Sequence, residues 1–231
     1  MAKELTISNK SSLAVLNKAK SLLSVTNSLL NNNFSNLIEW ADNNKIDIQI
    51  FPRDKDKLLN LSELYLEYYS IAYLPEEIEL LSSLEKLVIT NSNLQTLPLN
   101  LFNLKKIQKL SLYENNLIKI EKDIENLTNL KELNLRNNFL KEMPIEIGNL
   151  QNLTILNLSW NKLNHIPATI SSLINLKELH LDNNNLTSLP TSIIQLKQLT
   201  KLYLQFNNIT LTNLQKDWII ELEKNGCKVI L

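Results

Sequence analysis

The fold is decided by a stretch in the second half of the chain, residues 153–175, which reads LTILNLSWNKLNHIPATISSLIN. Its arrangement of leucine, asparagine and proline returns at a spacing of 23 residues, the step from position 167 to position 190. The six prolines of the chain all lie on this spacing: Pro52, Pro75, Pro98, Pro144, Pro167 and Pro190. Glutamate occupies the remaining step, position 121. Self-similarity at a period of this length is typical of solenoids, in which each repeat forms one coil.

Each repeat follows the pattern LxxLxLxxNxLxxLPxxIxxLxx. Seven units open with a leucine or isoleucine on this lattice: Leu61, Leu84, Ile107, Leu130, Leu153, Leu176 and Leu199. The LxL segment alternates apolar and polar residues, which is the period of a half-buried strand. The proline stands where a short helical turn begins, a position that proline favours. We therefore expect one short strand and one short helical turn in every coil.

This motif resembles that of the leucine-rich repeat family, specifically its 23-residue LPxxI type, which is found in intracellular scaffolds and in many bacterial proteins. The resemblance covers residues 61–212, about two-thirds of the chain. It implies an α/β solenoid, a right-handed superhelix of about seven repeats with one strand per repeat on the concave side. It further implies a protein-interaction module that is not an enzyme.

An asparagine recurs at the ninth position of the repeat, where the chain leaves the strand. The five copies are Asn115, Asn138, Asn161, Asn184 and Asn207. Backbone groups at this bend need partners inside the coil, and an amide side chain offers both a donor and an acceptor. We expect these residues to form a structural ladder, not a binding site.

The repeats, residues 61–211, are expected to lie between two caps. In the N-terminal cap, residues 34–60, apolar positions from Phe34 to Ala41 mark a helical face, and residues 46–50 alternate as a strand. The prolines and leucines of this region stay on the 23-residue lattice, so a degenerate coil is also expected there.

The C-terminal cap, residues 212–231, is expected to be a helix followed by a strand. Thr212 with Gln215 fits a capping box, and the Asn225–Gly226 pair is a typical helix stop. Cys227 is the single cysteine, so no internal disulfide can form. We interpret it as a small buried residue.

Residues 1–33 are rich in serine and asparagine and form a separate N-terminal segment in this prediction. Their apolar residues follow two heptad-like series: Leu16, Leu23 and Leu30, and Val15, Leu22 and Leu29. An amphipathic helix is expected between residues 11 and 30. Three roles stay open for it: docking on the cap, a flexible segment, or a partner-binding helix.

Composition narrows the classes of partner. Lysine plus arginine and aspartate plus glutamate number 24 each, so the chain lacks the basic surplus that nucleic acids and anionic membranes attract. No stretch approaches the roughly 20 apolar residues of a membrane span, and none resembles a signal peptide. We expect a monomeric cytoplasmic protein that binds another protein and carries no cofactor.

Side chains between the core leucines of each strand point toward the concave surface. Aromatic residues are scarce in the chain, at 6%, yet several fall on these positions, where the core does not need them. Tyr, Trp and Arg are also the residues enriched at interface hot spots. The predicted partner-binding residues are Tyr65, Tyr68, Tyr113, Arg136, Trp160, His180, Asp182, Tyr203 and Phe206.

A catalytic or metal site is not expected. Glu178, His180 and Asp182 alternate on one strand, but a single strand presents three metal ligands poorly. A triad of Ser159 with His180 and Asp182 fails because the aspartate cannot orient a histidine from the same strand. The sequence also lacks a glycine-rich phosphate loop, CxxC and HExxH.

The leading hypothesis is thus a protein-interaction module acting as a scaffold or regulator. An alternative is a bacterial effector that binds host proteins after delivery into the host cytosol, with the first 30 or so residues as the secretion signal. It draws on the Asn-, Lys- and Ile-rich composition, which hints at an AT-rich genome. An enzyme, such as a repeat-guided ubiquitin ligase acting through Cys227, is the least favoured because no catalytic domain of adequate length is present.

Overall fold

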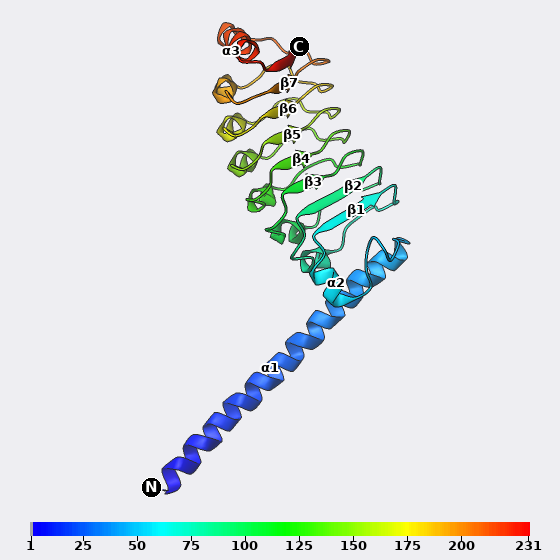
Figure 1. The fold of residues 1–231 in the computed structure, drawn as a ribbon, viewed down its shortest axis with the longest axis vertical. Helices are drawn as coiled ribbons and strands as arrows, with labels where there is room; N and C mark the ends of the chain where they lie inside the picture. The colour runs from blue at the N-terminus through cyan, green and yellow to red at the C-terminus, as the bar shows by residue number, and fades with distance from the viewer. Residues whose placement is uncertain (1) are drawn as a thin grey trace.

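The computed structural model describes residues 2–231, and for residues 2–17, 25 and 27 it describes the helical backbone alone. A long helix, α1 (Ala2–Asn43), and a short helix, α2 (Lys55–Leu59), precede a stack of coils. Figure 1 shows the strands of successive coils side by side along one face of the stack and single helical turns along the other. We call the strand-lined face the concave face.

Residues 2–231 contain one parallel sheet of eight strands, which pair in chain order. The strands are β1 (Glu63–Glu67), β2 (Lys86–Thr90), β3 (Lys109–Ser111), β4 (Glu132–Asn134), β5 (Ile155–Asn157), β6 (Glu178–His180), β7 (Lys201–Tyr203) and β8 (Lys228–Ile230). Equivalent positions of neighbouring repeats pair in register, for example Leu133 with Leu156. The predicted solenoid is confirmed.

A 3₁₀ turn follows the proline position in each of six coils. The turns are η1 (Glu76–Leu80), η2 (Leu99–Asn103), η3 (Lys122–Asn126), η4 (Ile145–Asn149), η5 (Ala168–Ser172) and η6 (Thr191–Gln195). Proline precedes the first residue of the turn, with an extended backbone, and its carbonyl accepts the first hydrogen bond. Glu121 adopts the same conformation without the ring, with φ −73° and ψ 152°. The fixed φ of proline favours this geometry without being required for it.

The asparagine ladder is confirmed. The Asn161 side-chain oxygen accepts a hydrogen bond from the Leu140 amide at 3.0 Å. Its amide nitrogen donates to the carbonyls of Leu135 at 2.9 Å and Leu158 at 3.1 Å. Asn115, Asn138, Asn184 and Asn207 make equivalent bonds to the preceding coil. Each asparagine therefore joins two coils where the backbone bends.

The predicted strand at residues 46–50 is wrong, because this segment is a turn. The Asp47 carboxylate accepts a hydrogen bond from the Gln49 amide at 2.7 Å, and the Asp47 carbonyl accepts from Ile50 and Phe51. Ile48 is 63% exposed, so the apparent alternation has no buried face to support it. The side chain of Asp47 satisfies the backbone locally, and an aspartate turn replaces the strand.

The N-terminal helix α1 continues without a break through residue 33, where two segments were expected. Phe34, Leu37, Trp40 and Ala41 are buried against the first coil, as the predicted helical face requires. Upstream, Leu22 and Leu23 are about 60% exposed, and the helix extends away from the coils (Figure 1). The side chains of Val15 and Leu16, part of the heptad-like series, lie outside those described. No helix among the described residues is long and apolar enough to span a membrane.

The C-terminal cap matches its prediction. Helix α3 (Asn213–Lys224) begins with a complete capping box between Thr212 and Gln215. Its apolar face covers the last coil, and β8 pairs with β7 to complete the sheet. Gly226 has φ 85°, the left-handed conformation that ends the helix. Cys227 is buried, and burial raises the pKa of its thiol.

Candidate interaction surface

The first column of concave residues follows the strand register. Successive pairs connect Tyr65, Val88, Ser111, Asn134, Asn157, His180 and Tyr203. The pairing brings His180 beside Tyr203, and their rings stack at 4.6 Å between centroids with 20° between the planes. The Lys228 ammonium lies 5.5 Å from the Tyr203 ring. This end of the concave face is therefore a packed aromatic and cationic cluster.

Glu178 fixes His180 from the same strand. Its carboxylate is 3.3 Å from His180 Nε2 and 2.9 Å from Lys201 Nζ. Burial acts to raise the pKa of Glu178, but hydrogen bonds from Lys201 and His180 outweigh it, and the net shift is downward. Glu178 therefore stays ionised at neutral pH and holds the stacked pair in place.

Three residues from adjacent coils form the centre of the surface, and we call them the central cluster: Tyr113, Arg136 and Trp160. The Arg136 guanidinium lies 6.0 Å from the Tyr113 ring centroid and 5.7 Å from that of Trp160. Trp160 is 49% exposed, and Tyr113 and Arg136 are half-buried. Cation–π contacts of this kind hold the guanidinium between the two rings.

The Tyr113 hydroxyl donates a hydrogen bond to the Glu114 carboxylate at 2.5 Å. This bond, followed by burial, raises the pKa of Tyr113, so the hydroxyl stays protonated at neutral pH. Within the described residues, no carboxylate lies within salt-bridge distance of the Arg136 guanidinium. The charge of Arg136 is thus available to a partner.

Asp182 was predicted to contact a partner, and this placement is wrong. It is 6% exposed, and its carboxylate accepts hydrogen bonds from Ser159 Oγ at 2.5 Å and from Asn183 Nδ2 at 2.9 Å. Ser159 is itself fully buried. The pair forms a hydrogen bond between coils beneath the surface, and its serine is inaccessible to any substrate.

The column just before the asparagine ladder has an unusual backbone. Every member has a positive φ between 51° and 63°: Tyr68, Asn91, Glu114, Asn137, Trp160, Asn183 and Phe206. Asparagine tolerates this left-handed conformation, whereas bulky residues adopt it at a cost of roughly 1–2 kcal/mol. Tyr68 and Phe206 are more than 70% exposed, so packing of their side chains offsets little of this conformational free energy. Strained, exposed aromatic residues are typical of functional positions.

The predicted site residues therefore fall into separate groups along the concave face. The central cluster and the His180–Tyr203 stack lie on the coils of β3 to β7, whereas Tyr65 and Tyr68 lie on the first coil. Tyr65 donates a hydrogen bond to Glu63 at 2.9 Å, which raises the pKa of Tyr65. Phe206 lies at the far end beside the C-terminal cap.

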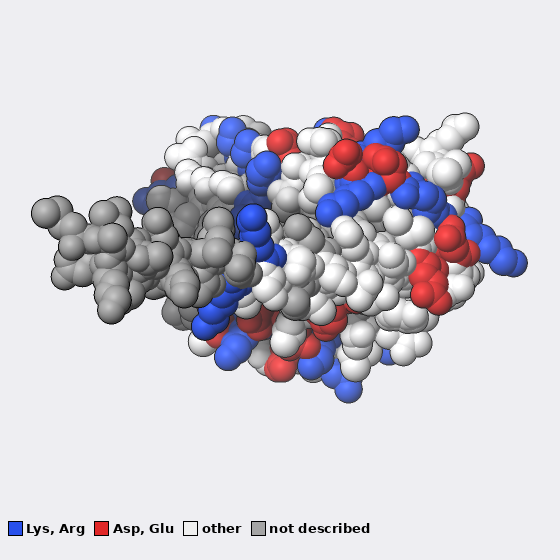
Figure 2. Space-filling model, turned by 90° about the horizontal axis from the view of Figure 1, so that it is seen from below, with Lys and Arg blue, Asp and Glu red and all other residues white. Residues whose placement is uncertain are grey.

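Sequence reasoning missed a column at the start of the strands in which every residue but Ile155 is charged. The strand register connects Glu63, Lys86, Lys109, Glu132, Ile155, Glu178, Lys201 and Lys228. Opposite charges pair across coils, as in Lys86 with Glu63 at 2.6 Å and Lys109 with Glu132 at 2.7 Å. The 23-residue spacing of these charges was the available signal. Figure 2 shows basic and acidic groups interspersed over the coloured part of the view from below.

No group of three or more metal-ligating side chains is found among the described residues. Glu178 and His180 do lie side by side, but Asp182 turns away into its bond with Ser159. The surface offers ring faces, amides and separate charges, which suit recognition of a macromolecular surface.

The stacked coils of one strand and one 3₁₀ turn form a leucine-rich repeat fold. Residues 119–224 match a family model described as a leucine-rich repeat region. Among solved structures, the chain is similar to a leucine-rich repeat protein of Leptospira interrogans, with 32% identity and a TM-score of 0.61, over 77% of this chain and 51% of that one. No curated protein sequence matches the chain.

Two plant receptors are also similar in structure. One is the leucine-rich repeat ectodomain of the membrane receptor kinase GASSHO1/SCHENGEN3 from Arabidopsis thaliana, in complex with Casparian strip integrity factor 2 (29% identity, TM-score 0.64, 74% of this chain and 21% of that one). The other is the plant peptide hormone receptor RGFR1 in complex with RGF2 (32% identity, TM-score 0.62, 71% and 31%). The chain spans about half the length of the Leptospira protein and less of either receptor.

Proposed function

We propose that this chain is a protein-interaction module that binds a polypeptide partner on its concave face, with the central cluster as the main contact. The observation that carries the proposal is the Arg136 guanidinium held between the Tyr113 and Trp160 rings. Three coils contribute one residue each, so the cluster exists only because the repeats stack in register.

The chemistry of the cluster suits a peptide. Aromatic rings offer large contact areas that lose little side-chain entropy on binding, and a preplaced guanidinium can bond a carboxylate or a backbone carbonyl. The stacked His180 and Tyr203 extend the same surface toward the C-terminal cap. A partner lying across the strands would contact both groups.

The similarity to the plant receptors supports a polypeptide partner. One of them is described as a peptide hormone receptor, and it shares 32% identity with this chain over the aligned repeats. Stacked repeats in general form extended concave surfaces that bind other macromolecules.

The test selects peptides from a displayed random library against the immobilised full chain and then measures their binding to variants. The test variant combines Tyr113→Ala, Arg136→Ala and Trp160→Ala. The matched control combines Leu99→Ala with Ile145→Ala, because both side chains are more than half exposed on the 3₁₀ turns, away from the strands.

We expect the selected peptides to bind the test variant about 100-fold more weakly, as the loss of hot-spot residues predicts, and to bind the control unchanged. Circular dichroism of the test variant should match the parent, since its substituted side chains lie outside the buried core. Equal binding to the test variant and the parent contradicts the proposal.

A further inference from the structure

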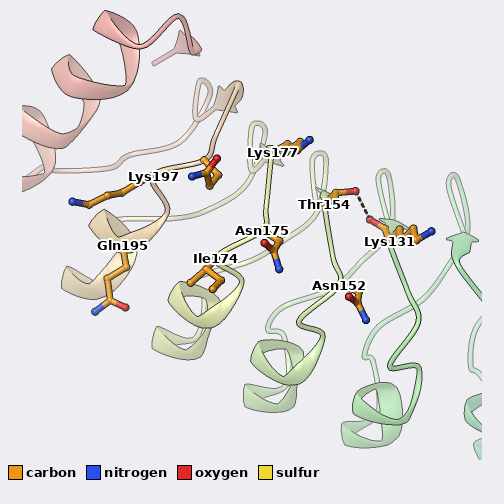
Figure 3. Close-up of a pocket in the computed structure, with 9 residues that line it drawn as sticks. Lys131, Asn152, Thr154, Ile174, Asn175, Lys177, Gln195 and Lys197 are labelled. Atoms are coloured by element: carbon orange, nitrogen blue, oxygen red, sulfur yellow. Dashed lines mark hydrogen bonds between the residues drawn. The ribbon is translucent and has the colours of Figure 1, made fainter.

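A second surface lies at the edge of the solenoid where the chain passes from the 3₁₀ turns into the strands. Here a groove of about 540 Å³ crosses the coils of β4 to β7. It is lined by three lysines, four amide side chains, Thr154 and Ile174. Figure 3 shows them arising from successive coils, with Gln195 and Lys197 on the side of the 3₁₀ turns.

Two of the amide side chains of this edge groove, those of Asn152 and Asn175, are held in place by hydrogen bonds. Asn152 Nδ2 donates to the carbonyl of Thr128 at 2.8 Å, and Asn175 Nδ2 donates to the carbonyl of Gln151 at 2.9 Å. These bonds repeat from coil to coil and form a second asparagine ladder. Because each amide uses its nitrogen in the ladder, its oxygen is oriented to accept a hydrogen bond from a bound chain.

The charge of the edge groove has one sign. Lys131, Lys177 and Lys197 are exposed, and no acidic side chain lines the groove among the described residues. Lys131 Nζ donates to the Gln108 amide oxygen at 2.9 Å, a neutral partner. None of the three ammonium groups lies within salt-bridge distance of a carboxylate in the part of the chain that the structure describes.

We infer that the edge groove binds an acidic polypeptide segment in the polyproline II conformation, with carboxylates at every third residue. Lys131 and Lys177 occupy equivalent positions two strands apart, since Glu132, Ile155 and Glu178 pair in register beside them. Neighbouring strands are ~4.8 Å apart, so the two lysines repeat at ~10 Å. A polyproline II helix has three residues per turn and rises ~3.1 Å per residue, so every third side chain lies on the same side at a spacing of ~9 Å, close to that of the two lysines.

The lining favours a peptide over a nucleic acid. Arginine, which binds phosphate in a two-pronged geometry, does not line the described groove, and neither does an aromatic ring on which a base could stack. Fixed amides suit the alternating donors and acceptors of a peptide backbone, and Ile174, which is 56% exposed, offers an apolar contact. This surface is separate from the central cluster and does not depend on it.

The test uses the ¹⁵N-labelled full chain at low ionic strength and a short peptide with glutamate at every third position among glycine, serine and asparagine. Three probes serve for comparison: the same peptide with glutamine for glutamate, a peptide of equal composition with adjacent glutamates, and an oligothymidylate of equal charge. The groove variant is Lys131→Gln/Lys177→Gln/Lys197→Gln. The matched variant, Lys119→Gln/Lys141→Gln/Lys162→Gln, removes three exposed lysines that follow the strands in their coils.

We expect the spaced peptide to shift the backbone amide signals of residues 131, 154 and 177 most. Its affinity should fall about tenfold in the groove variant and stay unchanged in the matched variant. An equal loss of peptide affinity in both variants would show that the peptide binds by general charge attraction, and it would overturn the inference. If the adjacent-glutamate peptide bound as tightly as the spaced peptide, the inferred spacing would be wrong. If the oligothymidylate bound more tightly than the spaced peptide, the assignment of a peptide ligand would be wrong.

Discussion

Two neighbouring positions in each coil behave differently, although they are one residue apart. The inner position holds asparagine in five coils, buried in four of them, and bonds each of these coils to the one before it. The outer position just before it has a left-handed backbone in all seven coils and holds asparagine, glutamate, tyrosine, tryptophan or phenylalanine. Where the side chain bonds one coil to the next, the same residue recurs from the third coil to the seventh.

At the outer position the backbone conformation is the same in every coil, but the residue type varies. Asn91, Asn137 and Asn183 are the residues that suit its backbone, and they alternate with residues that do not. Trp160 belongs to the central cluster, and Tyr68 and Phe206 project into solvent. The comparison indicates that the inner column stabilises the solenoid, whereas the aromatic outer residues carry a cost to stability that we attribute to the proposed binding function.

The largest effect is expected at the inner column. Asn161→Ala removes the acceptor of the Leu140 amide and the donor to the Leu135 and Leu158 carbonyls, all in a buried environment. We expect the free energy of unfolding to fall by about 3 kcal/mol, because each unpaired buried group costs ~1–3 kcal/mol. Urea denaturation followed by circular dichroism measures the change.

Asn164→Ala is the control, since Asn164 is exposed in the same coil. Its effect should stay within ~0.5 kcal/mol, as for most surface substitutions. Equal losses in the two variants would show that the ladder does not stabilise the solenoid.

A smaller effect of opposite sign is expected at the outer column. Phe206→Asn replaces a ring that is 75% exposed by the residue that suits φ 58°. We expect the free energy of unfolding to rise by about 1 kcal/mol, and the reciprocal Asn137→Phe to lower it by a similar amount. Thermal unfolding of both variants checks the pair. A loss of stability in Phe206→Asn would mean that the ring stabilises the cap, against the comparison.

The smallest effect concerns pH. The pKa of Glu178 is lowered in the folded chain, so its contribution to stability is present at neutral pH and is lost as the pH falls through the folded-state pKa. The difference in unfolding free energy between the parent and Glu178→Gln should be below ~1 kcal/mol at neutral pH and shrink on acidification. Urea denaturation from pH 7 to pH 3 measures it. A difference that grows toward acid would contradict the assigned ion pair.

Sequence alone predicted the elements that repeat. Period, strand positions, the asparagine ladder and the C-terminal capping box follow from short local rules, and seven copies of the motif reinforce each other. Prediction from the sequence failed where a single residue determines the local structure. Asp47 turns an alternating segment into a turn, and no periodic pattern signals a hydrogen bond from a single side chain.

The candidate site was predictable in part. Alternation placed Tyr113, Arg136 and His180 on the concave face, but it could not show that Asp182 bonds Ser159 beneath it. The left-handed backbone of the outer column also escaped prediction, because tryptophan and phenylalanine carry no local signal for it. The edge groove lies outside the strands, where alternation says nothing about which side chains meet.

Hydroxyl-radical footprinting of the chain with and without a selected peptide tests the central claim most directly. Mass spectrometry follows the oxidation of Tyr113 and Trp160, with Tyr73, which is 59% exposed before the first 3₁₀ turn, as an internal reference. We predict that the bound peptide slows oxidation of Tyr113 and Trp160 and leaves Tyr73 unchanged. Unchanged oxidation of Tyr113 and Trp160 in the saturated complex would contradict binding at the central cluster.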